Sequence, residues 1–260
     1  MNSASHSHSP AAPPLTILTG ASRGLGLGVA QVLLAKGHRL LTLQRKPNPS
    51  LVGTDASQLV QWSVDLTDPV PVAACLQAWL AACSPGSFSA LNLIHNAALL
   101  VEPGPLSDAD PAAISAATRA SLEAPLVLTA AFLKASEGFD GPRKVLSISS
   151  GLGRNAMAGS VVYCAVKAGM DHYSRALALE EAQKPRGAQI VSLAPGIIDT
   201  DMQVQLRGAD RGKFPEGARF ASFKSEGRLD SPQVAGAKIV AYLERADFGS
   251  RVIADVRDPA

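Results

Sequence analysis

The stretch that decides the fold is "LTILTGASRGLGLGVAQVLLAKG" (15–37). It opens with a short run of β-forming residues, continues through a turn with glycines at positions 20, 24 and 26, and ends in apolar residues at helical spacing before Gly37. A strand, a glycine-rich turn and a helix in this order bring backbone N–H groups and the positive end of the helix to one point, where they can bind a pyrophosphate. The alternative is a tight structural turn without a ligand.

The rest of the chain repeats this pattern. Short apolar runs follow one another, with helical stretches between most of them, and such alternation is typical of a parallel sheet covered by helices on both faces. The sequence therefore predicts one α/β domain of the Rossmann type over residues 15–260, with a doubly wound parallel sheet of about seven strands. The expected strands are 15–19, 39–43, 60–64, 91–95, 144–148, 188–194 and 251–255.

Length and composition agree with a single domain that binds a small molecule. The 260 residues are 47% hydrophobic and 18% charged, which is enough to bury one sizeable core. The formal net charge of +2 comes from scattered charges, so neither nucleic acid nor a membrane is an expected partner. Three cysteines at no metal-ligand spacing predict no metal site and indicate a reducing compartment, the cytoplasm.

Two segments stand apart from the repeating pattern. Residues 1–14 lack the apolar and basic regions of a signal peptide, and we expect them to form a disordered tail. Residues 203–230 are polar, contain glycines and are long for a connection in a compact domain. Because loops of that length are often lids, we expect this one to cover the substrate.

The end of the second expected strand bears on which dinucleotide is bound. An enzyme that uses NAD usually has an acidic residue there to bind the ribose 2′-hydroxyl, whereas this chain reads "LQRK" (43–46). Arg45, together with Arg23 in the glycine turn, offers guanidinium groups suited to a 2′-phosphate. This favours NADP(H), and the alternative is that both arginines are surface charges.

Two polar residues follow expected strands at the edge where an open α/β sheet binds ligands. Asp65 comes after the third strand and Asn96 after the fourth. Both are candidates for contact with the dinucleotide, and for Asp65 a turn-forming role is the alternative.

The candidate chemistry lies in "SSGLGRNAMAGSVVYCAVK" (149–167). Residues four apart share a helix face, so Tyr163 and Lys167 project together. Two charges about 4 Å apart at an effective dielectric near 20 gain roughly 4 kcal/mol, about what brings a tyrosine pKa from about 10 to near 7. The pair can therefore act as a general acid or base, with a serine hydroxyl to orient a carbonyl. A core helix that happens to carry polar residues is the alternative.

Together these stretches resemble the short-chain dehydrogenase/reductase family. The matching motifs cover residues 15–256 and are "TGASRGLG" (19–26), "HNAA" (95–98), the serine, tyrosine and lysine just described, and "PGIIDT" (195–200). The glycine spacing, with a longer first gap than G-x-G-x-x-G, is the variant that this family uses.

The resemblance implies a role for each matching residue. Ser150 would hold the substrate carbonyl, Tyr163 would pass the proton, and Lys167 would bind the nicotinamide ribose and lower the tyrosine pKa. Ser149, one residue further from the tyrosine than the family's serine, is then structural. The family usually forms homodimers or homotetramers. The implied contacts to NADP(H) are Gly20, Ser22, Arg23, Gly24, Leu25, Gly26, Arg45, Asp65, Leu66, Asn96, Tyr163, Lys167, Pro195, Gly196, Ile198 and Thr200.

A narrower resemblance concerns the substrate. "LAPGIIDTDMQ" (193–203), "RF" (219–220) and "SEGRLDSPQ" (225–233) are similar to the bacterial benzil reductases, which are themselves similar to sepiapterin reductases. This implies NADPH-dependent reduction of a ketone or of one carbonyl of a 1,2-dicarbonyl. The alternatives are an NAD-dependent alcohol dehydrogenase and an NADPH-binding protein without turnover.

The resemblance also implies which segments surround the substrate. Loops at 97–106 and 151–158 would shape the pocket together with the lid. Leu152, Met157 and Phe223 are either its apolar lining or ordinary core residues.

One position departs from the family pattern. The helix after the fourth strand reads "ATRASLEAPLVLT" (117–129), with Ser121 where the family has an asparagine. In the family that asparagine helps to hold a water beside the lysine in a proton relay. Either the shorter Ser121 keeps that water through its hydroxyl, or the relay is weaker.

Overall fold

The computed structural model describes residues 12–55, 57–84 and 86–259. Most of the expected N-terminal tail lies outside these ranges. The carbonyl of Pro13 accepts a hydrogen bond from the Ser89 N–H at 3.2 Å, and that of Pro14 accepts one from the Arg39 N–H at 2.9 Å. The backbone contacts of the domain therefore begin before Leu15, the residue at which the sequence places the boundary.

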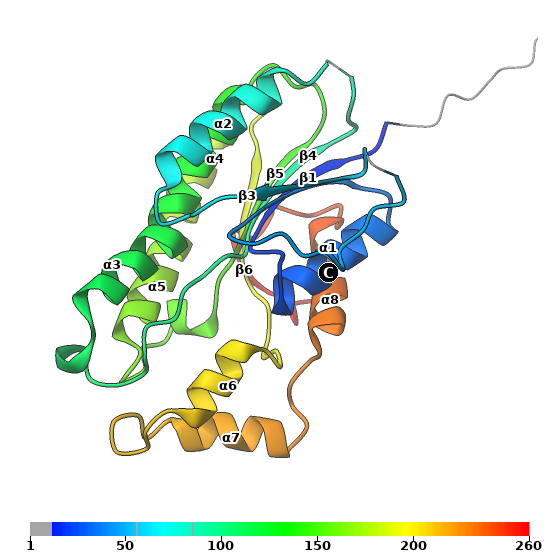
Figure 1. Cartoon of the computed structure of the whole chain (residues 1–260). Helices are drawn as coiled ribbons and strands as arrows, with labels where there is room; N and C mark the ends of the chain where they lie inside the picture. Colours follow the sequence, from blue (N-terminus) through cyan, green and yellow to red (C-terminus); the bar gives the residue numbers. More distant parts are fainter. Residues whose placement is uncertain (1–11, 56, 85, 260) are drawn as a thin grey trace, which may run out of the picture.

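A sheet of seven parallel strands forms the centre of the molecule, as predicted (Figure 1). The strand order is β3-β2-β1-β4-β5-β6-β7, and every neighbouring pair is parallel. Each strand begins and ends within two residues of its expected range. The strands are β1 Leu15–Thr19, β2 Arg39–Gln44, β3 Leu59–Ser63, β4 Leu91–His95, β5 Arg143–Ile148, β6 Gln189–Ala194 and β7 Ile253–Asp255.

Helices cover both faces of the sheet. One face is packed by α2, α4 and α5 around Leu76, Leu128 and Phe132, and the other by α1 and α8 around Leu33 and Ile239. No helix in the described ranges combines the length and the apolar character needed to cross a membrane. The helices are α1 Gly24–Ala35, α2 Pro69–Ala81, α3 Pro111–Thr118, α4 Ala124–Ala135, α5 Val161–Glu181, α6 Asp201–Gly208, α7 Gly217–Ser225 and α8 Pro232–Leu243.

The strand order reverses between β1 and β4. Because the helices that follow these two strands lie on opposite faces, a crevice forms outside their carboxyl ends, where open α/β sheets bind ligands. The glycine turn follows β1 and Asn96 follows β4, so the fold brings both to this crevice.

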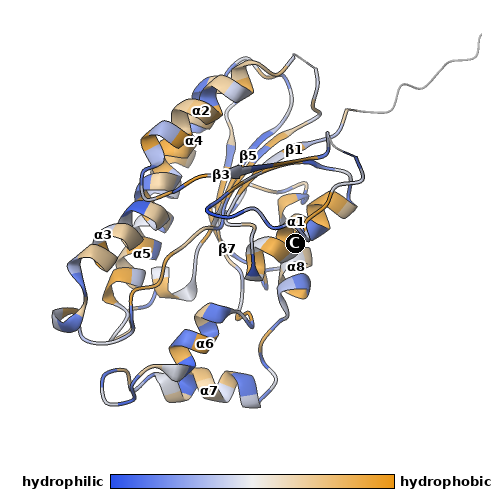
Figure 2. Ribbon diagram, in the orientation of Figure 1, coloured by the Kyte–Doolittle hydropathy of each residue, from blue (hydrophilic) through white to orange (hydrophobic). Residues whose placement is uncertain are grey.

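The segment expected as a lid loop, 203–230, is folded for most of its length. It contains most of α6 and all of α7, which lie apart from the helices on the sheet (Figure 1). Phe214, Phe220 and Phe223 form a small apolar cluster, with ring centroids 5.9 Å and 5.8 Å apart in successive pairs. Both helices mix hydrophilic and hydrophobic residues (Figure 2). The cluster is completed by residues outside the segment, such as Leu100, so the segment's own pattern does not reveal the helices.

Candidate active site

The glycine turn between β1 and α1 requires all three of its glycines. Gly20 and Gly24 have φ values of +73° and +53°, which side-chain-bearing residues rarely adopt. A Cβ on Gly26 would lie 2.0 Å from the Gly20 carbonyl oxygen. The Asn96 side-chain amide donates to the carbonyls of Thr19 and Gly20 at 3.1 Å and 3.0 Å. Asn96, predicted as a dinucleotide contact, thus braces the turn through its amide group.

The start of α1 is suited to an anion. Arg23 precedes the helix in an extended conformation, no side chain caps the helix, and its first turn contains no acidic residue. The first N–H groups of a helix lack partners within it and carry a positive partial charge. The residues present therefore fit the pyrophosphate of a dinucleotide, with Ser22 and Leu25 in the same turn.

The loop at 195–200 lies against the glycine turn. The Thr200 methyl group is 3.4 Å from the position that a Cβ on Gly24 would take, and Arg23 forms an ion pair with Asp201 at the start of α6. Ile198 pairs with Asp230 in an isolated parallel bridge. Of the predicted residues of this loop, the structure thus places Thr200 against the turn, while contact of Pro195, Gly196 and Ile198 with a dinucleotide stays a prediction.

The ends of β2 and β3 hold the residues predicted to face the adenosine ribose. The side chain of Arg45 is exposed and, in the described ranges, has no carboxylate within ion-pair distance. Asp65 accepts a hydrogen bond from the Thr67 N–H at 2.9 Å, which holds the pKa of Asp65 below its usual value, and the charge of Arg45 acts in the same direction. Asp65 is therefore a turn former, and the Leu66 side chain lies in the core. Their contact with a dinucleotide stays a prediction.

Ser150, Tyr163 and Lys167 come together where β5 meets α5. The Lys167 Nζ donates to the Ile148 carbonyl at 2.6 Å and lies 5.7 Å from the centroid of the Tyr163 ring. The Ser150 Oγ accepts from the Leu152 N–H at 3.1 Å and is hydrogen-bonded to Tyr163. This is the set of side chains that the sequence predicts.

Burial sets the protonation of these groups. It raises the pKa of Tyr163, and the hydrogen bond with Ser150 opposes that rise only in part. It also lowers the pKa of Lys167 to about 8, although the nearby Asp171 carboxylate raises that pKa. Tyr163 therefore keeps its proton at neutral pH in this structure. The lowering of its pKa by Lys167 stays a prediction.

Two buried hydrogen-bonded pairs of side chains, which the sequence does not reveal, lie near Lys167. The Nε2 of His95 is 2.8 Å from the Thr129 Oγ1, and the Tyr173 hydroxyl is 2.7 Å from the Ser147 Oγ. Burial, with the charge of Lys167, lowers the pKa of His95 to about 3. His95 is therefore a neutral hydrogen-bonding residue. The "HNAA" motif locates it, but only the packing of α4 and α5 shows its partners.

Ser121 lies in a short π-helix, η2 (Arg119–Glu123), between α3 and α4. Its buried hydroxyl accepts a hydrogen bond from the Leu99 N–H at 3.0 Å. The side chain that replaces the family's asparagine therefore anchors the loop after β4.

A small pocket opens beside Tyr163. It is lined by the loop after β4, including Leu100 and Glu102, and by residues 159–163. Met157 and Phe223 belong instead to the apolar cluster of α6 and α7, which is the core alternative for both.

Comparison with known proteins identifies the family. The protein-family model described as short chain dehydrogenase matches residues 15–211 of the sequence. The chain is a short-chain dehydrogenase/reductase. As a member of this family it is an oxidoreductase that uses a nicotinamide cofactor, and its Rossmann-type fold is that of the family.

Similar proteins narrow the relationship within the short-chain dehydrogenases/reductases. Benzil reductase ((S)-benzoin forming) of Bacillus cereus is 31% identical over 235 residues, which cover 89% of this chain and 94% of that protein. Sepiapterin reductase of Meriones unguiculatus is 32% identical over 256 residues, which cover 93% of this chain and 95% of that protein. A crystal structure of a short-chain dehydrogenase/reductase from Burkholderia vietnamiensis is 32% identical, with a TM-score of 0.64 over 96% of this chain and 100% of that one. The resemblance to benzil and sepiapterin reductases is thus confirmed.

Proposed function

We propose that this short-chain dehydrogenase/reductase is an NADPH-dependent carbonyl reductase that acts on a ketone or on one carbonyl of a 1,2-dicarbonyl such as benzil. The observation that carries the proposal is a half-buried, protonated Tyr163 hydrogen-bonded to Ser150 and close to Lys167. The similarity to proteins named benzil reductase supports the substrate class.

Ser150 and Tyr163 would act together on the carbonyl oxygen. The Ser150 oxygen already accepts the Leu152 N–H, so its own proton is available to the substrate. The nicotinamide cofactor, when bound, supplies the hydride. Tyr163 then gives its proton to the oxygen on which negative charge develops. Because an alkoxide is a far stronger base than a phenolate, this transfer is favourable even from a tyrosine with a raised pKa.

Lys167 would stabilise the phenolate left behind. With a pKa of about 8, its ammonium group is mostly charged at pH 7. A cation close to the ring favours the ionised tyrosine after transfer. The raised tyrosine pKa also favours reduction over oxidation, because oxidation requires Tyr163 to be the phenolate at the start.

NADP(H) is the proposed cofactor, held by the residues predicted for it. Arg45 offers an exposed guanidinium at the end of β2 for the 2′-phosphate. Arg23 is paired with Asp201, but both side chains are more than 70% exposed, and such pairs contribute at most about 1 kcal/mol. A phosphate can therefore displace that carboxylate. The homodimer or homotetramer, the cytoplasmic location and the covering role of 203–230 stay predictions.

The test is oxidation of NADPH in the presence of benzil and related diketones. We expect Tyr163→Phe to lose roughly 10²- to 10⁴-fold in kcat, the usual contribution of a general acid, while binding NADPH with unchanged affinity. If neither protein consumes NADPH with any carbonyl although both bind it, the chain is a dinucleotide-binding protein without turnover.

A second arm of the test concerns the choice of cofactor. Arg45→Ala should weaken NADPH binding about tenfold and leave NADH binding unchanged, because only NADPH carries the 2′-phosphate. Arg186→Ala is the control. Arg186 is also exposed, but it precedes β6 and so lies at the amino ends of the strands, whereas Arg45 follows the carboxyl end of β2. An unchanged preference in Arg45→Ala would remove Arg45 from the site.

A further inference from the structure

A buried carboxylate lies behind the proposed catalytic side chains. Asp171 is on α5, one turn beyond Lys167, and is 2% exposed. Its Oδ1 accepts from the Ser149 Oγ at 2.5 Å and from the Ser192 Oγ at 2.6 Å, and its Oδ2 accepts from the Arg154 Nε at 3.3 Å. A buried charge is tolerated when it is paired and hydrogen-bonded, and Asp171 meets both conditions.

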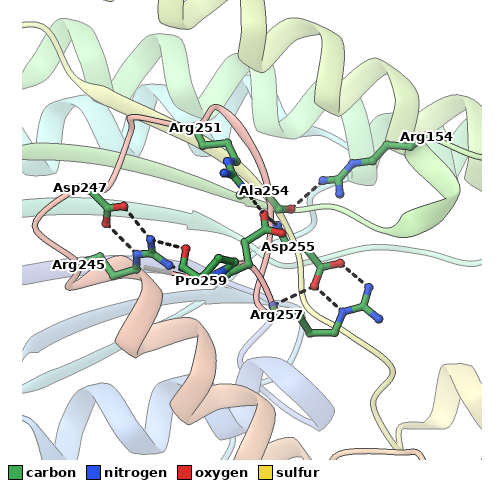
Figure 3. A network of polar contacts seen from close by, with 9 residues as sticks. Arg154, Arg245, Asp247, Arg251, Ala254, Asp255, Arg257 and Pro259 are labelled. Carbon is green, nitrogen blue, oxygen red and sulfur yellow. Dashed lines mark hydrogen bonds and ion pairs between the residues drawn. The ribbon is translucent and has the colours of Figure 1, made fainter.

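The partners of Asp171 come from the segments that hold Ser150. Ser149 is the preceding residue, and Arg154 follows the short turn η3 (Gly151–Gly153) that Ser150 starts. Arg154 also donates to the Ala254 carbonyl of β7 at 2.8 Å (Figure 3). The carboxylate therefore connects α5 with the end of β5, with β6 and, through Arg154, with β7.

The turn η3 is pressed directly onto this part of α5. A Cβ on Gly153 would lie 2.9 Å from the Lys167 carbonyl oxygen and 3.0 Å from the Asp171 Oδ2. Only a glycine lets the turn approach so closely. Ser150 is thus held from both sides, by Ser149 before it and by the turn after it.

We propose that Asp171 is a positioning residue that fixes the Ser150 hydroxyl relative to Tyr163 and Lys167. The inference rests on the proposed function and adds a residue to it. Ser150 must place its hydroxyl and the Tyr163 hydroxyl on the same substrate oxygen, and errors of about 1 Å in such an arrangement cost up to about 100-fold in rate.

The same carboxylate acts on Lys167 through its charge. Lys167 is faced by His95 from β4 and by Tyr163 and Asp171 from its own helix, while Arg154 faces Asp171. His95 is neutral and Tyr163 is protonated, so Asp171 is the group that raises the pKa of Lys167 against burial. Removing its charge should lower that pKa further.

The test is Asp171→Asn, which keeps the shape of the side chain and removes its charge. We expect kcat for diketone reduction with NADPH to fall roughly tenfold to 100-fold, with a much smaller change in KM. The alkaline limb of the kcat profile, near pH 8 where Lys167 loses its proton, should move to lower pH. Ser149→Ala should lower kcat less and leave the limb in place, because the charge remains.

Glu181→Gln is the matched control. Glu181 is also a 2% exposed carboxylate on α5, but it is bonded to the Ala188 N–H and to Lys184, at the far end of the helix. It should lower stability without changing kcat or the pH profile. If Asp171→Asn keeps the wild-type kcat and limb, or changes no more than Glu181→Gln, Asp171 is only structural and the proposal is overturned.

A readout without turnover separates this proposal from the proposed function. The ionisation of Lys167 can be followed by NMR in wild type and Asp171→Asn, without substrate. A lower Lys167 pKa in the variant supports the effect of Asp171 even if wild type reduces no carbonyl, and an unchanged pKa contradicts it. Wild type that binds NADPH but reduces nothing refutes the proposed function alone.

Discussion

Among single residues, burial decides which groups carry charge in this site. Tyr163 keeps its proton and His95 stays neutral for the same reason, loss of water around the ionised form. In the same region, Arg154 and two serine hydroxyls donate hydrogen bonds to the Asp171 carboxylate in place of water. Each of these assignments depends on partners that are remote in sequence.

His95 should make the folded protein sensitive to acid. Its pKa is about 3 when folded and 6.5 as a reference for the unfolded chain, so between these values the unfolded chain binds a proton that the folded protein does not. Stability therefore falls as pH falls below about 6.5, by up to about 1.4 kcal/mol per unit. His95→Gln should reduce the slope of Tm against pH between about 4 and 6.

The control for this slope is His172→Gln, because His172 is an exposed histidine on α5. Its removal should leave the slope unchanged. His38, whose pKa burial also lowers, remains in every variant, so the slope should decrease rather than vanish. A wild-type slope in His95→Gln would mean that His95 does not stay neutral in the folded protein.

At the scale of elements, Ser121 in the short π-helix at 119–123 anchors the loop after β4. Ser121→Ala leaves the Leu99 N–H without its acceptor in a buried place, which should lower the free energy of unfolding by about 1–3 kcal/mol. Denaturant unfolding measures this loss. Ser115→Ala on the exposed side of α3 is the control and should change stability by less than about 0.5 kcal/mol. Equal stabilities for the two variants would contradict the anchoring role.

The strands and the glycine turn could be predicted from sequence because their signals are local. β1 and β4 are runs of five buried residues, and Gly20 and Gly24 occupy conformations that favour glycine. The π-helix could not be predicted, because it is a local departure from regular helix between α3 and α4. The helices of 203–230 were missed because their apolar residues pack partly against Leu100 and Met157, far away in sequence.

The candidate site divides in the same way. The spacing of Tyr163 and Lys167 on one helix face is visible in the sequence, and continuing it by four residues reaches Asp171. The partners of that carboxylate are not visible, because Ser192 comes from another strand. Nor does spacing show whether burial or the lysine charge controls the tyrosine, since the answer depends on how much water reaches the phenol.

At the scale of the whole molecule, the unit of α6 and α7 has its own apolar cluster beside the sheet domain. Phe214 is fully buried in that cluster, and its ring lies 2.6 Å from where a Cβ on Gly159 would be, close to the pocket beside Tyr163. Ion pairs of Lys213 with Asp108 and of Arg23 with Asp201 join the unit to the main domain, but they are exposed and weak. Apolar packing therefore determines whether the unit stays in place.

Phe214→Ala should loosen this unit and leave the sheet domain intact. We expect KM for a diketone to rise several-fold, NADPH affinity to stay the same, and proteases to cleave faster within 203–230, because removing a buried phenylalanine costs about 3–5 kcal/mol of local packing. Phe248→Ala is the control, since Phe248 is 1% exposed in the core beneath α8. It should lower the Tm of the whole protein without selective cleavage at 203–230. If both variants lower Tm equally and show the same cleavage pattern, α6 and α7 unfold together with the sheet and cannot open as a lid.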